Sequence, residues 1–272
     1  MSEILDRWRA GEGLPDVLAI DGHTHVGEWP HGANYETFEE MIAGARAVLD
    51  ANGVDAACVM AGGYMWNGTD YRIGNDILID LWRRLPEQIV PFAHFNPNDR
   101  LEAMLAELER VYAAGVRCIK LLNAYQDYPG DGPNLMALYR FADEHNMLIL
   151  DHSWSREEIT RIASEFPGTD FIFGHYGHWQ DPILKQYPNV HANIWTLSSL
   201  GFLARGVRSV GPEKFLFGSD AFMNPISVGI GLVVYADIPD DHKRLILGQN
   251  QARLLAKVGA LPAALKERYE GR

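Results

Sequence analysis

The stretch VLAIDGHTH, residues 17–25, joins the pattern of a buried strand to a pair of histidines. Residues 17–20 are all apolar, as expected of a strand that is covered on both faces. His23 and His25 follow directly, and side chains two residues apart in an extended chain point the same way. We therefore expect both imidazoles to face the inside of the fold, with Thr24 facing the other side.

The same alternation of an apolar run with a helix-period segment extends outward from this stretch over the whole chain. Helix-start signals separate the runs, and Thr37 with Glu40, like Ser155 with Glu158, has the spacing of a capping box. Eight such units predict an α/β fold of the (β/α)8 TIM-barrel type, since a doubly wound sheet usually has fewer strands and a glycine-rich phosphate loop. The expected strands occupy residues 17–21, 56–60, 89–95, 116–122, 147–152, 170–175, 190–195 and 214–220.

Composition agrees with one folded domain over residues 1–272, because 47% of the residues are hydrophobic and only 22% are charged. A formal net charge of −12 disfavours nucleic acid and anionic membranes as partners. Cys58 and Cys118 lie in apolar runs and are interpreted as buried thiols. The chain start lacks a signal-peptide pattern, and the run at residues 228–236 is too short to cross a bilayer, so we expect a cytoplasmic protein.

Ligand-type residues fall at the ends of several predicted strands. His152, His175 and Asp220 end the fifth, sixth and eighth strands, while the histidine pair follows the first. Carboxyl ends of barrel strands meet at one mouth, so these residues should converge there. Imidazoles and a carboxylate suit zinc, with an open position for a water molecule. Such a water ionises near neutral pH, and Asp220 could be both ligand and proton carrier.

Four segments, in this order, resemble the metal motifs of the amidohydrolase superfamily in its amidohydrolase-related branch: AIDGHTH (19–25), LILDHS (148–153), FIFGHYG (171–177) and FLFGSDAF (215–222). That branch includes aminocarboxymuconate semialdehyde decarboxylase, related aromatic acid decarboxylases and lactone hydrolases. The resemblance implies that one divalent metal, zinc or alternatively manganese, is held by His23, His25, His152 and Asp220. It also implies a catalytic role for His175 beside the metal. Asp151 departs from the pattern, because an apolar residue is commoner before the strand-five histidine.

Lys120, on the predicted fourth strand, is open to three interpretations. Binuclear members of the superfamily carry a carbamylated lysine on this strand that bridges two metals. The residue could instead pair with Asp220 or another buried carboxylate, or anchor a substrate. The resemblance is to the mononuclear type, which favours the second and third interpretations.

Aromatic residues in the loops near the expected mouth suggest a small, partly apolar or ring-containing substrate. Arg72, Arg100 and Arg156 begin helices there and could clamp a carboxylate or simply lie in solvent. His94 and His145 are assigned structural roles. The residues expected to bind substrate are Trp29, Tyr64, Trp66, Lys120, Tyr125, Trp154, His178 and Trp195.

Two reactions fit these residues. The first is hydrolysis of a lactone, amide or ester by metal-activated water, with Asp220 passing the proton and His175 steadying the oxyanion. The alternative is non-oxidative decarboxylation of an aromatic or unsaturated acid. The motifs support both equally, and the absence of an arginine cluster favours hydrolysis. A binding module without chemistry ranks below both, because unpaired buried histidines are costly without a metal. Tyr187, Phe202 and Tyr235 leave a homodimer open.

Overall fold

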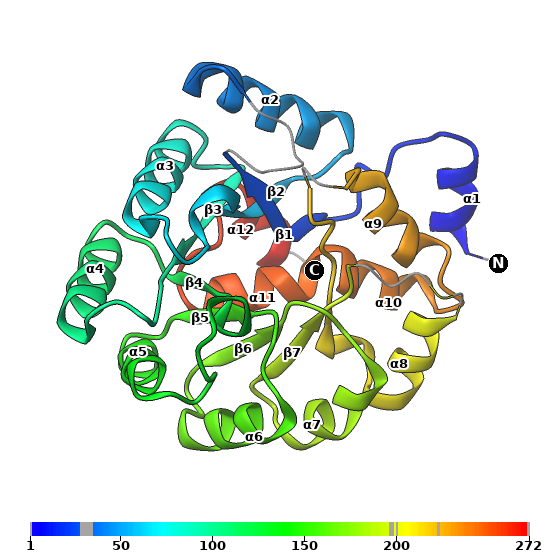
Figure 1. Ribbon diagram of the computed structural model, residues 1–272. Coiled ribbons are helices and arrows are strands. Elements are labelled where there is room, and N and C mark those ends of the chain that lie inside the picture. The colour runs from blue at the N-terminus through cyan, green and yellow to red at the C-terminus, as the bar shows by residue number, and fades with distance from the viewer. Residues whose placement is uncertain (1, 28–34, 196–198, 200, 222–223, 271–272) are drawn as a thin grey trace.

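The computed structural model describes residues 2–27, 35–195, 199, 201–221 and 224–270, and it confirms the (β/α)8 barrel (Figure 1). All eight strands are parallel and pair in chain order from β1 to β8. Most strands are shorter than the apolar runs that predicted them, because the ends of those runs bend out of the ladder. The strands are β1 (Ile20–Val26), β2 (Ala56–Ala61), β3 (Ile89–His94), β4 (Cys118–Leu121), β5 (Leu148–Asp151), β6 (Asp170–Phe173), β7 (Val190–Asn193) and β8 (Phe215–Leu216).

The barrel closes between β8 and β1 through single bonds rather than a regular ladder. Gly22 N donates to Phe217 O at 2.9 Å, and Asp220 N donates to His23 O at 2.8 Å. One isolated parallel bridge joins Thr24 to the residue after Asp220. This irregular seam therefore lies between two of the expected metal-ligand segments.

Strand β1 differs from the expectation in its position and in its register. It begins three residues later than predicted and contains both histidines instead of ending before them. Asp21 pairs with Ala57 but Thr24 pairs with Val59, so β1 has one residue more than β2 over this stretch. An extra residue on one strand is a β-bulge.

The bulge decides which way the two histidines point. Ile20 packs in the barrel interior, and a strict period of two would bring Gly22 and Thr24 to the interior after it. One extra residue shifts this phase, so His23 and His25 face inward. The expected orientation of the pair is thus correct, but it depends on a bulge that we did not predict.

Helices surround the barrel in the order of the chain (Figure 1). Both predicted capping boxes are present, at Thr37 with Glu40 and at Ser155 with Glu158. The helices are α1 (Glu3–Arg9), α2 (Phe38–Ala51), α3 (Tyr71–Arg84), α4 (Leu101–Ala113), α5 (Pro133–Glu144), α6 (Arg156–Glu165), α7 (Asp181–Gln186), α8 (Phe202–Val210), α9 (Ile226–Val234), α10 (Asp240–Arg244), α11 (Asn250–Lys257) and α12 (Ala263–Glu270). Short 3-10 turns follow three strands, at η1 (Gly62–Tyr64), η2 (Asn123–Gln126) and η3 (His178–Gln180). A further 3-10 turn, η4 (Pro212–Lys214), precedes β8, and a π-helical turn, η5 (Leu245–Gln249), precedes α11.

The C-terminal helices α11 and α12 cover one end of the barrel. Their apolar side chains join the interior cluster that contains Cys58 and Cys118, both free thiols as expected. Lys257 of α11 binds Asp170 at the start of β6, with Nζ 2.7 Å from Oδ2. Arg268 of α12 binds Asp55, just before β2. Because these partners precede strands, the two helices fill the N-terminal end and leave the other end for the site.

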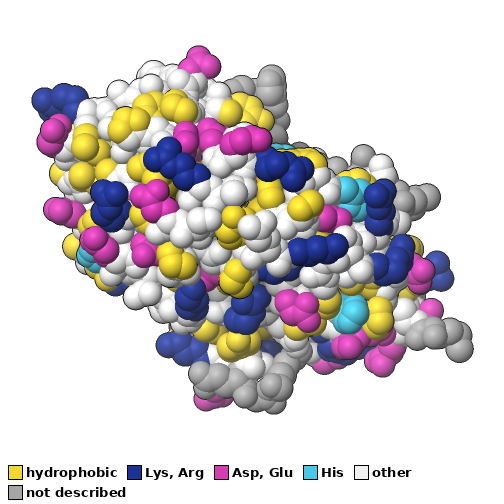
Figure 2. Space-filling model, turned by 90° about the horizontal axis from the view of Figure 1, so that it is seen from below, with side chains coloured by type: hydrophobic (Ala, Val, Ile, Leu, Met, Phe, Trp, Pro, Cys, Tyr) yellow, Lys and Arg dark blue, Asp and Glu magenta, His cyan; other side chains and the backbone are white. Residues whose placement is uncertain are grey.

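The surface carries both signs of charge. Figure 2 shows basic and acidic side chains interspersed with apolar ones over one face of the molecule. Among the described helices, none combines the length and apolarity that crossing a membrane requires. Tyr235, directly after α9, is 56% exposed, whereas Tyr187 and Phe202 pack partly against the core. The homodimer stays a prediction.

Candidate metal centre

The side chains of His23, His25, His152 and Asp220 converge at the C-terminal end of the strands. His25 Nε2 lies 2.9 Å from Asp220 Oδ1, and His23 Nε2 lies 3.7 Å from the same oxygen. These three residues present ligand atoms within 4.8 Å of one another. His152 joins them through His23, with 3.2 Å between the two Nε2 atoms. The structure thus brings together the four residues that the motifs indicated.

The spacing of these atoms fits one metal ion. Tetrahedral ligands at zinc–nitrogen distances of about 2.0–2.1 Å lie roughly 3.3 Å from one another. The three pairs with a measured distance, His25 with Asp220, His23 with Asp220 and His152 with His23, fall within half an ångström of that value, whereas His152 lies outside the group whose ligand atoms are all within 4.8 Å of one another. Two imidazole nitrogens at 3.2 Å can share a proton in a hydrogen bond or bind one cation, and three imidazoles with a carboxylate are a donor set that suits a divalent metal.

Buried charge in the same part of the barrel supports this fit. Asp21, Asp151 and Asp220 are almost completely buried, as is Lys120. Among the described residues near the cluster, three carboxylates therefore face one ammonium. Buried charges are stable only when they are compensated. A divalent cation would supply positive charge beside Asp151 and Asp220, and Asp21 adds little to this requirement because burial raises its pKa to about 7.

The histidines are held in the neutral form that a metal requires. Burial holds the pKa of His23 and of His152 well below the ordinary value, and the ammonium of Lys120 acts in the same direction. Burial also lowers the pKa of His25, although its bond to Asp220 opposes this shift. Neutral imidazoles keep a free lone pair for coordination.

Two glycines in the motifs make room for these side chains. A Cβ on Gly174, which follows β6, would lie 2.1 Å from His152 Cδ2. A Cβ on Gly22 would lie 2.9 Å from the Phe217 carbonyl oxygen, across the seam between β1 and β8. Asp220 adopts a left-handed backbone conformation with φ of 59°, which is unfavourable for a residue with a Cβ and persists only where its surroundings enforce it.

Lys120 points into the same space from β4. It is completely buried, and its Nζ has no hydrogen-bond partner among the described residues. Burial lowers its pKa, while Asp151 and Asp220 raise it in part. Asp151 is affected in the opposite sense, because burial raises its pKa and Lys120 lowers it. Lys120 and Asp151 thus affect each other electrostatically, although no hydrogen bond joins the two side chains.

His175 and Trp195 close one side of the cluster. The His175 ring lies 4.5 Å from the His152 ring and 4.2 Å from the Trp195 ring, measured between centroids. Trp195 also contacts His23, at 5.5 Å. Burial lowers the pKa of His175 to about 4, so this residue is a neutral imidazole at physiological pH.

The other predicted substrate contacts fall into two groups. Trp66 and Tyr125 meet edge to face at 5.8 Å, and the Tyr125 ring is 6.3 Å from that of His152, so they form a second wall. By contrast, the Trp154 indole donates to Tyr139 Oη at 3.1 Å and packs in the layer between sheet and helices.

Tyr64 and His178 also contact other parts of the fold. Tyr64 packs against the apolar layer between sheet and helices. His178 Nδ1 is 2.8 Å from Tyr176 Oη, and the His178 ring stacks at 4.0 Å on Phe202 of α8. Substrate contact by these two residues and by Trp154 stays a prediction. Trp29 lies outside the described residues.

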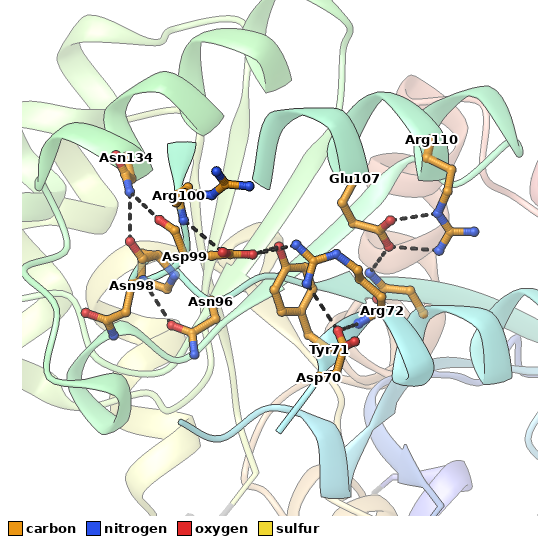
Figure 3. A network of polar contacts seen from close by, with 12 residues as sticks. Asp70, Tyr71, Arg72, Asn96, Asn98, Asp99, Arg100, Glu107, Arg110 and Asn134 are labelled. Atoms are coloured by element: carbon orange, nitrogen blue, oxygen red, sulfur yellow. Dashed lines mark hydrogen bonds and ion pairs between the residues drawn. The ribbon is translucent and has the colours of Figure 1, made fainter. Parts of the chain in front are cut away.

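Of the three arginines expected near the mouth, Arg72 and Arg156 are occupied by other groups, as Figure 3 shows for Arg72, whereas Arg100 is exposed. Arg72 Nη2 lies 2.5 Å from Asp99 Oδ2, and Arg72 Nη1 lies 3.2 Å from Asp70 Oδ1. Arg156 Nη2 donates to the Trp179 carbonyl oxygen at 2.9 Å. Neither guanidinium is thus available as a carboxylate clamp, which leaves Lys120 as the buried cation of the described site.

His94 and His145 have the structural surroundings that we expected. His94 Nε2 accepts from Ala61 N at 2.9 Å, and the His145 ring stacks on Phe141 at 3.9 Å.

Two residues near the site were not predicted from the sequence, Asp21 and Asn193. Their side chains accept hydrogen bonds from backbone amides at the ends of strands. The available signal was an acidic or amide residue two positions before a site residue, a spacing that favours a side-chain turn.

Comparison with known proteins identifies the family. A family model described as Amidohydrolase matches residues 20–257. The match covers most of the chain and all of the converging residues, so the protein belongs to the amidohydrolase family. No curated protein sequence matches the chain.

Solved structures share the fold at low sequence identity. The 5-carboxyvanillate decarboxylase from Sphingomonas paucimobilis is 15% identical with a TM-score of 0.67, over 88% of this chain and 99% of that one. The 2,6-dihydroxybenzoate decarboxylase from Rhizobium is 15% identical with a TM-score of 0.68, over 88% and 98%. The 5-carboxyvanillate decarboxylase from Novosphingobium aromaticivorans, solved with manganese and 4-hydroxy-3-methoxy-5-nitrobenzoic acid, is 12% identical with a TM-score of 0.70, over 89% and 97%.

Proposed function

We propose that this protein is a metal-dependent carboxy-lyase that removes the carboxylate of a small aromatic or unsaturated acid as carbon dioxide. One observation carries the proposal: a metal-type donor set lies beside the buried ammonium of Lys120 and between aromatic walls made by Trp195 and Tyr125. Such a site suits a carboxylate on a flat, unsaturated body. The similar decarboxylase structures support this reaction, which replaces hydrolysis as our first choice.

His23, His25, His152 and Asp220 would hold the metal. The ion could be zinc or manganese, and the manganese in a similar structure makes the second as good a candidate as the first. When bound, a divalent ion supplies Lewis-acid chemistry that withdraws electron density from substrate oxygens.

The side chains of this site have separate tasks in the proposed reaction. The bond between the substrate carbon and its carboxylate breaks, carbon dioxide leaves, and the electron pair left on that carbon takes up a proton. We assign this proton to Asp220, which can accept it from a substrate hydroxyl or from water and pass it on. Lys120 offsets negative charge during the step, and His175 hydrogen-bonds a substrate oxygen.

Hydrolysis of a lactone, amide or ester is the second candidate. The family description favours it, and Asp220 and His175 are equally well placed to move a proton from water to a leaving group. The two reactions differ in the fate of solvent atoms. Hydrolysis adds a water oxygen to the product, whereas decarboxylation adds only a solvent hydrogen.

This difference provides the test. The purified protein, loaded with Mn²⁺ or Zn²⁺, is incubated with 2,6-dihydroxybenzoate, 5-carboxyvanillate and the lactone dihydrocoumarin, in H₂¹⁸O and separately in D₂O. We expect carbon dioxide release and one deuterium on the organic product from an acid, with no ¹⁸O incorporated. Incorporation of ¹⁸O from the lactone, without carbon dioxide from either acid, would establish hydrolysis instead. The control is protein stripped of metal by a chelator, which should be inactive.

A further inference from the structure

We propose that Asp21 is the positioning residue of the metal centre, whose carboxylate holds the β-bulge that turns His23 and His25 into the barrel. The same carboxylate ties this bulge to the segment that carries Asp220. The inference rests on the proposed metal site, and it assigns a role to a residue that does not itself coordinate the ion.

The first contact forms the bulge. Asp21 Oδ1 accepts a hydrogen bond from His23 N at 3.1 Å. A side chain that accepts from the amide two residues later makes an Asx turn, which replaces a backbone bond. The pairing of β1 with β2 shifts at this point. The Asx turn therefore gives the His23 amide a hydrogen-bond partner where the register of β1 shifts. It also reverses the alternation of side chains, so that His23 instead of Gly22 faces the barrel interior.

The second contact crosses the seam of the barrel. The same oxygen accepts from Ser219 N at 3.0 Å, and Asp220 N donates to His23 O at 2.8 Å. Asp21, His23 and the pair Ser219 and Asp220 thus form a closed ring of bonds. This ring fixes the separation of two metal ligands that lie almost two hundred residues apart, and it holds Asp220 in its left-handed conformation.

Burial shows that Asp21 is not an ordinary turn residue. It is completely buried, and its second oxygen, Oδ2, has no hydrogen-bond partner among the described residues. A carboxylate with one unpaired oxygen is a costly choice for a core position. The cost is explained if the first oxygen performs a task that an apolar side chain cannot perform.

The same device occurs at other strand ends of the site. Asp151 Oδ1 accepts from Ser153 N at 3.0 Å, and the proposed ligand His152 is the residue between them. Asn193 Oδ1 accepts from Trp195 N at 3.1 Å, before the aromatic wall. The example of Asn193 shows that a neutral amide can make this turn. An asparagine at position 21 should therefore preserve the geometry, although it removes the charge.

The test separates geometry from charge. Asp21→Asn keeps the acceptor oxygen and loses the charge, whereas Asp21→Glu keeps the charge and moves the oxygen by one methylene. Asp143→Glu is the matched control, because Asp143 Oδ1 likewise accepts from two amides, Gly168 N at 2.8 Å and Thr169 N at 2.9 Å, but Asp143 lies on α5 and these amides precede β6 at the opposite end.

The measurement is the dissociation constant of Mn²⁺ from chelator-stripped protein, followed by electron paramagnetic resonance of the free ion. We expect Asp21→Glu to weaken binding about 10- to 100-fold, as outer contacts of metal ligands commonly do. Asp21→Asn should stay within about threefold of the wild type, because its carbonyl oxygen offers the same two acceptor positions. Asp143→Glu should leave Mn²⁺ binding unchanged while it lowers the melting temperature.

Two results would overturn the inference. One is an Asp21→Glu protein that binds Mn²⁺ like the wild type. The other is a folded Asp21→Asn protein that loses the ion, since this would make charge and not the turn decisive. If Asp21→Glu does not fold, the Mn²⁺ affinity of Asp21→Asn alone decides between the turn and the charge. Wild-type protein that fails to bind Mn²⁺ and Zn²⁺ would instead refute the proposed metal site itself.

Discussion

Residue 174 must be glycine if His152 is to reach the other ligands. The ring of His152 occupies the space that a side chain at this position would need, with His152 Nε2 2.9 Å from the ideal Cβ. The neighbouring backbone belongs to β5 and β6, whose ladder is regular up to this point. The imidazole, rather than the sheet, would therefore have to move.

Gly174→Ala is accordingly expected to displace His152 and weaken metal binding. A shift of one ligand by about 1 Å breaks coordination geometry, so we expect a loss of at least tenfold in affinity. Calorimetric titration with Zn²⁺ measures this change.

Gly231→Ala on α9 is the control, because no atom lies within 4 Å of its ideal Cβ. This change should keep Zn²⁺ affinity and stabilise the helix by roughly 0.5–1 kcal/mol. Equal affinities in the two alanine variants would show that His152 is not held as described.

At the scale of elements, α11 completes the core of the barrel. Leu255 on this helix is completely buried and packs with apolar strand residues inside the barrel. The strands alone leave this end open, so the helix supplies part of the interior that they enclose. Strand packing in the barrel interior therefore depends on a segment that lies at the end opposite the proposed metal site.

Leu255→Ala should therefore cost about 2–5 kcal/mol of unfolding free energy, the usual range for a leucine removed from a packed core. Urea denaturation followed by circular dichroism provides the measurement. Val228→Ala on α9, where the valine is 57% exposed, should change stability by less than about 0.5 kcal/mol. If Leu255→Ala lowered the free energy of unfolding by less than Val228→Ala does, α11 would not fill the barrel interior as described.

At the scale of the whole molecule, buried histidines make the metal-free protein sensitive to acid. Six of them have a lowered pKa, with burial as the main cause: His23, His25, His94, His152, His175 and His191. The unfolded chain binds protons on these residues near pH 6.5, whereas His175 in the folded protein does so only near pH 4. The free energy of unfolding therefore decreases as the pH falls below 6.5.

Two buried carboxyl groups act in the opposite direction. Burial raises the pKa of Asp21 to about 7 and also raises that of Asp151, so each stabilises the folded state more as the pH falls toward 4. Because six histidines outnumber two carboxyl groups, the unfolded chain takes up more protons than the folded protein as the pH falls. Each such extra proton lowers the free energy of unfolding by about 1.4 kcal/mol per pH unit of acidification.

We therefore expect the urea midpoint of chelator-stripped protein to decrease from pH 7 to pH 5. His94→Gln, which removes one of the six buried imidazoles, should reduce this slope. A midpoint that rises on acidification would show that the carboxyl groups dominate.

The sequence by itself determined the barrel and the identity of the converging residues. Alternating apolar runs and capping residues act locally, so they can be recognised without knowledge of the fold. The order of the strands then placed His23, His25, His152 and Asp220 at one end, because parallel strands in a barrel share a direction.

Only the tertiary structure decided how these residues face one another. The bulge in β1 depends on contacts between Asp21 and Ser219, far apart in sequence, and period-two reasoning cannot show it. Trp154 and His178 lie close to ligands along the chain but turn toward the helices, because side chains at strand ends follow local turns rather than the pleat. Sequence fixes which groups reach the mouth of a barrel, whereas packing across its seam fixes their direction.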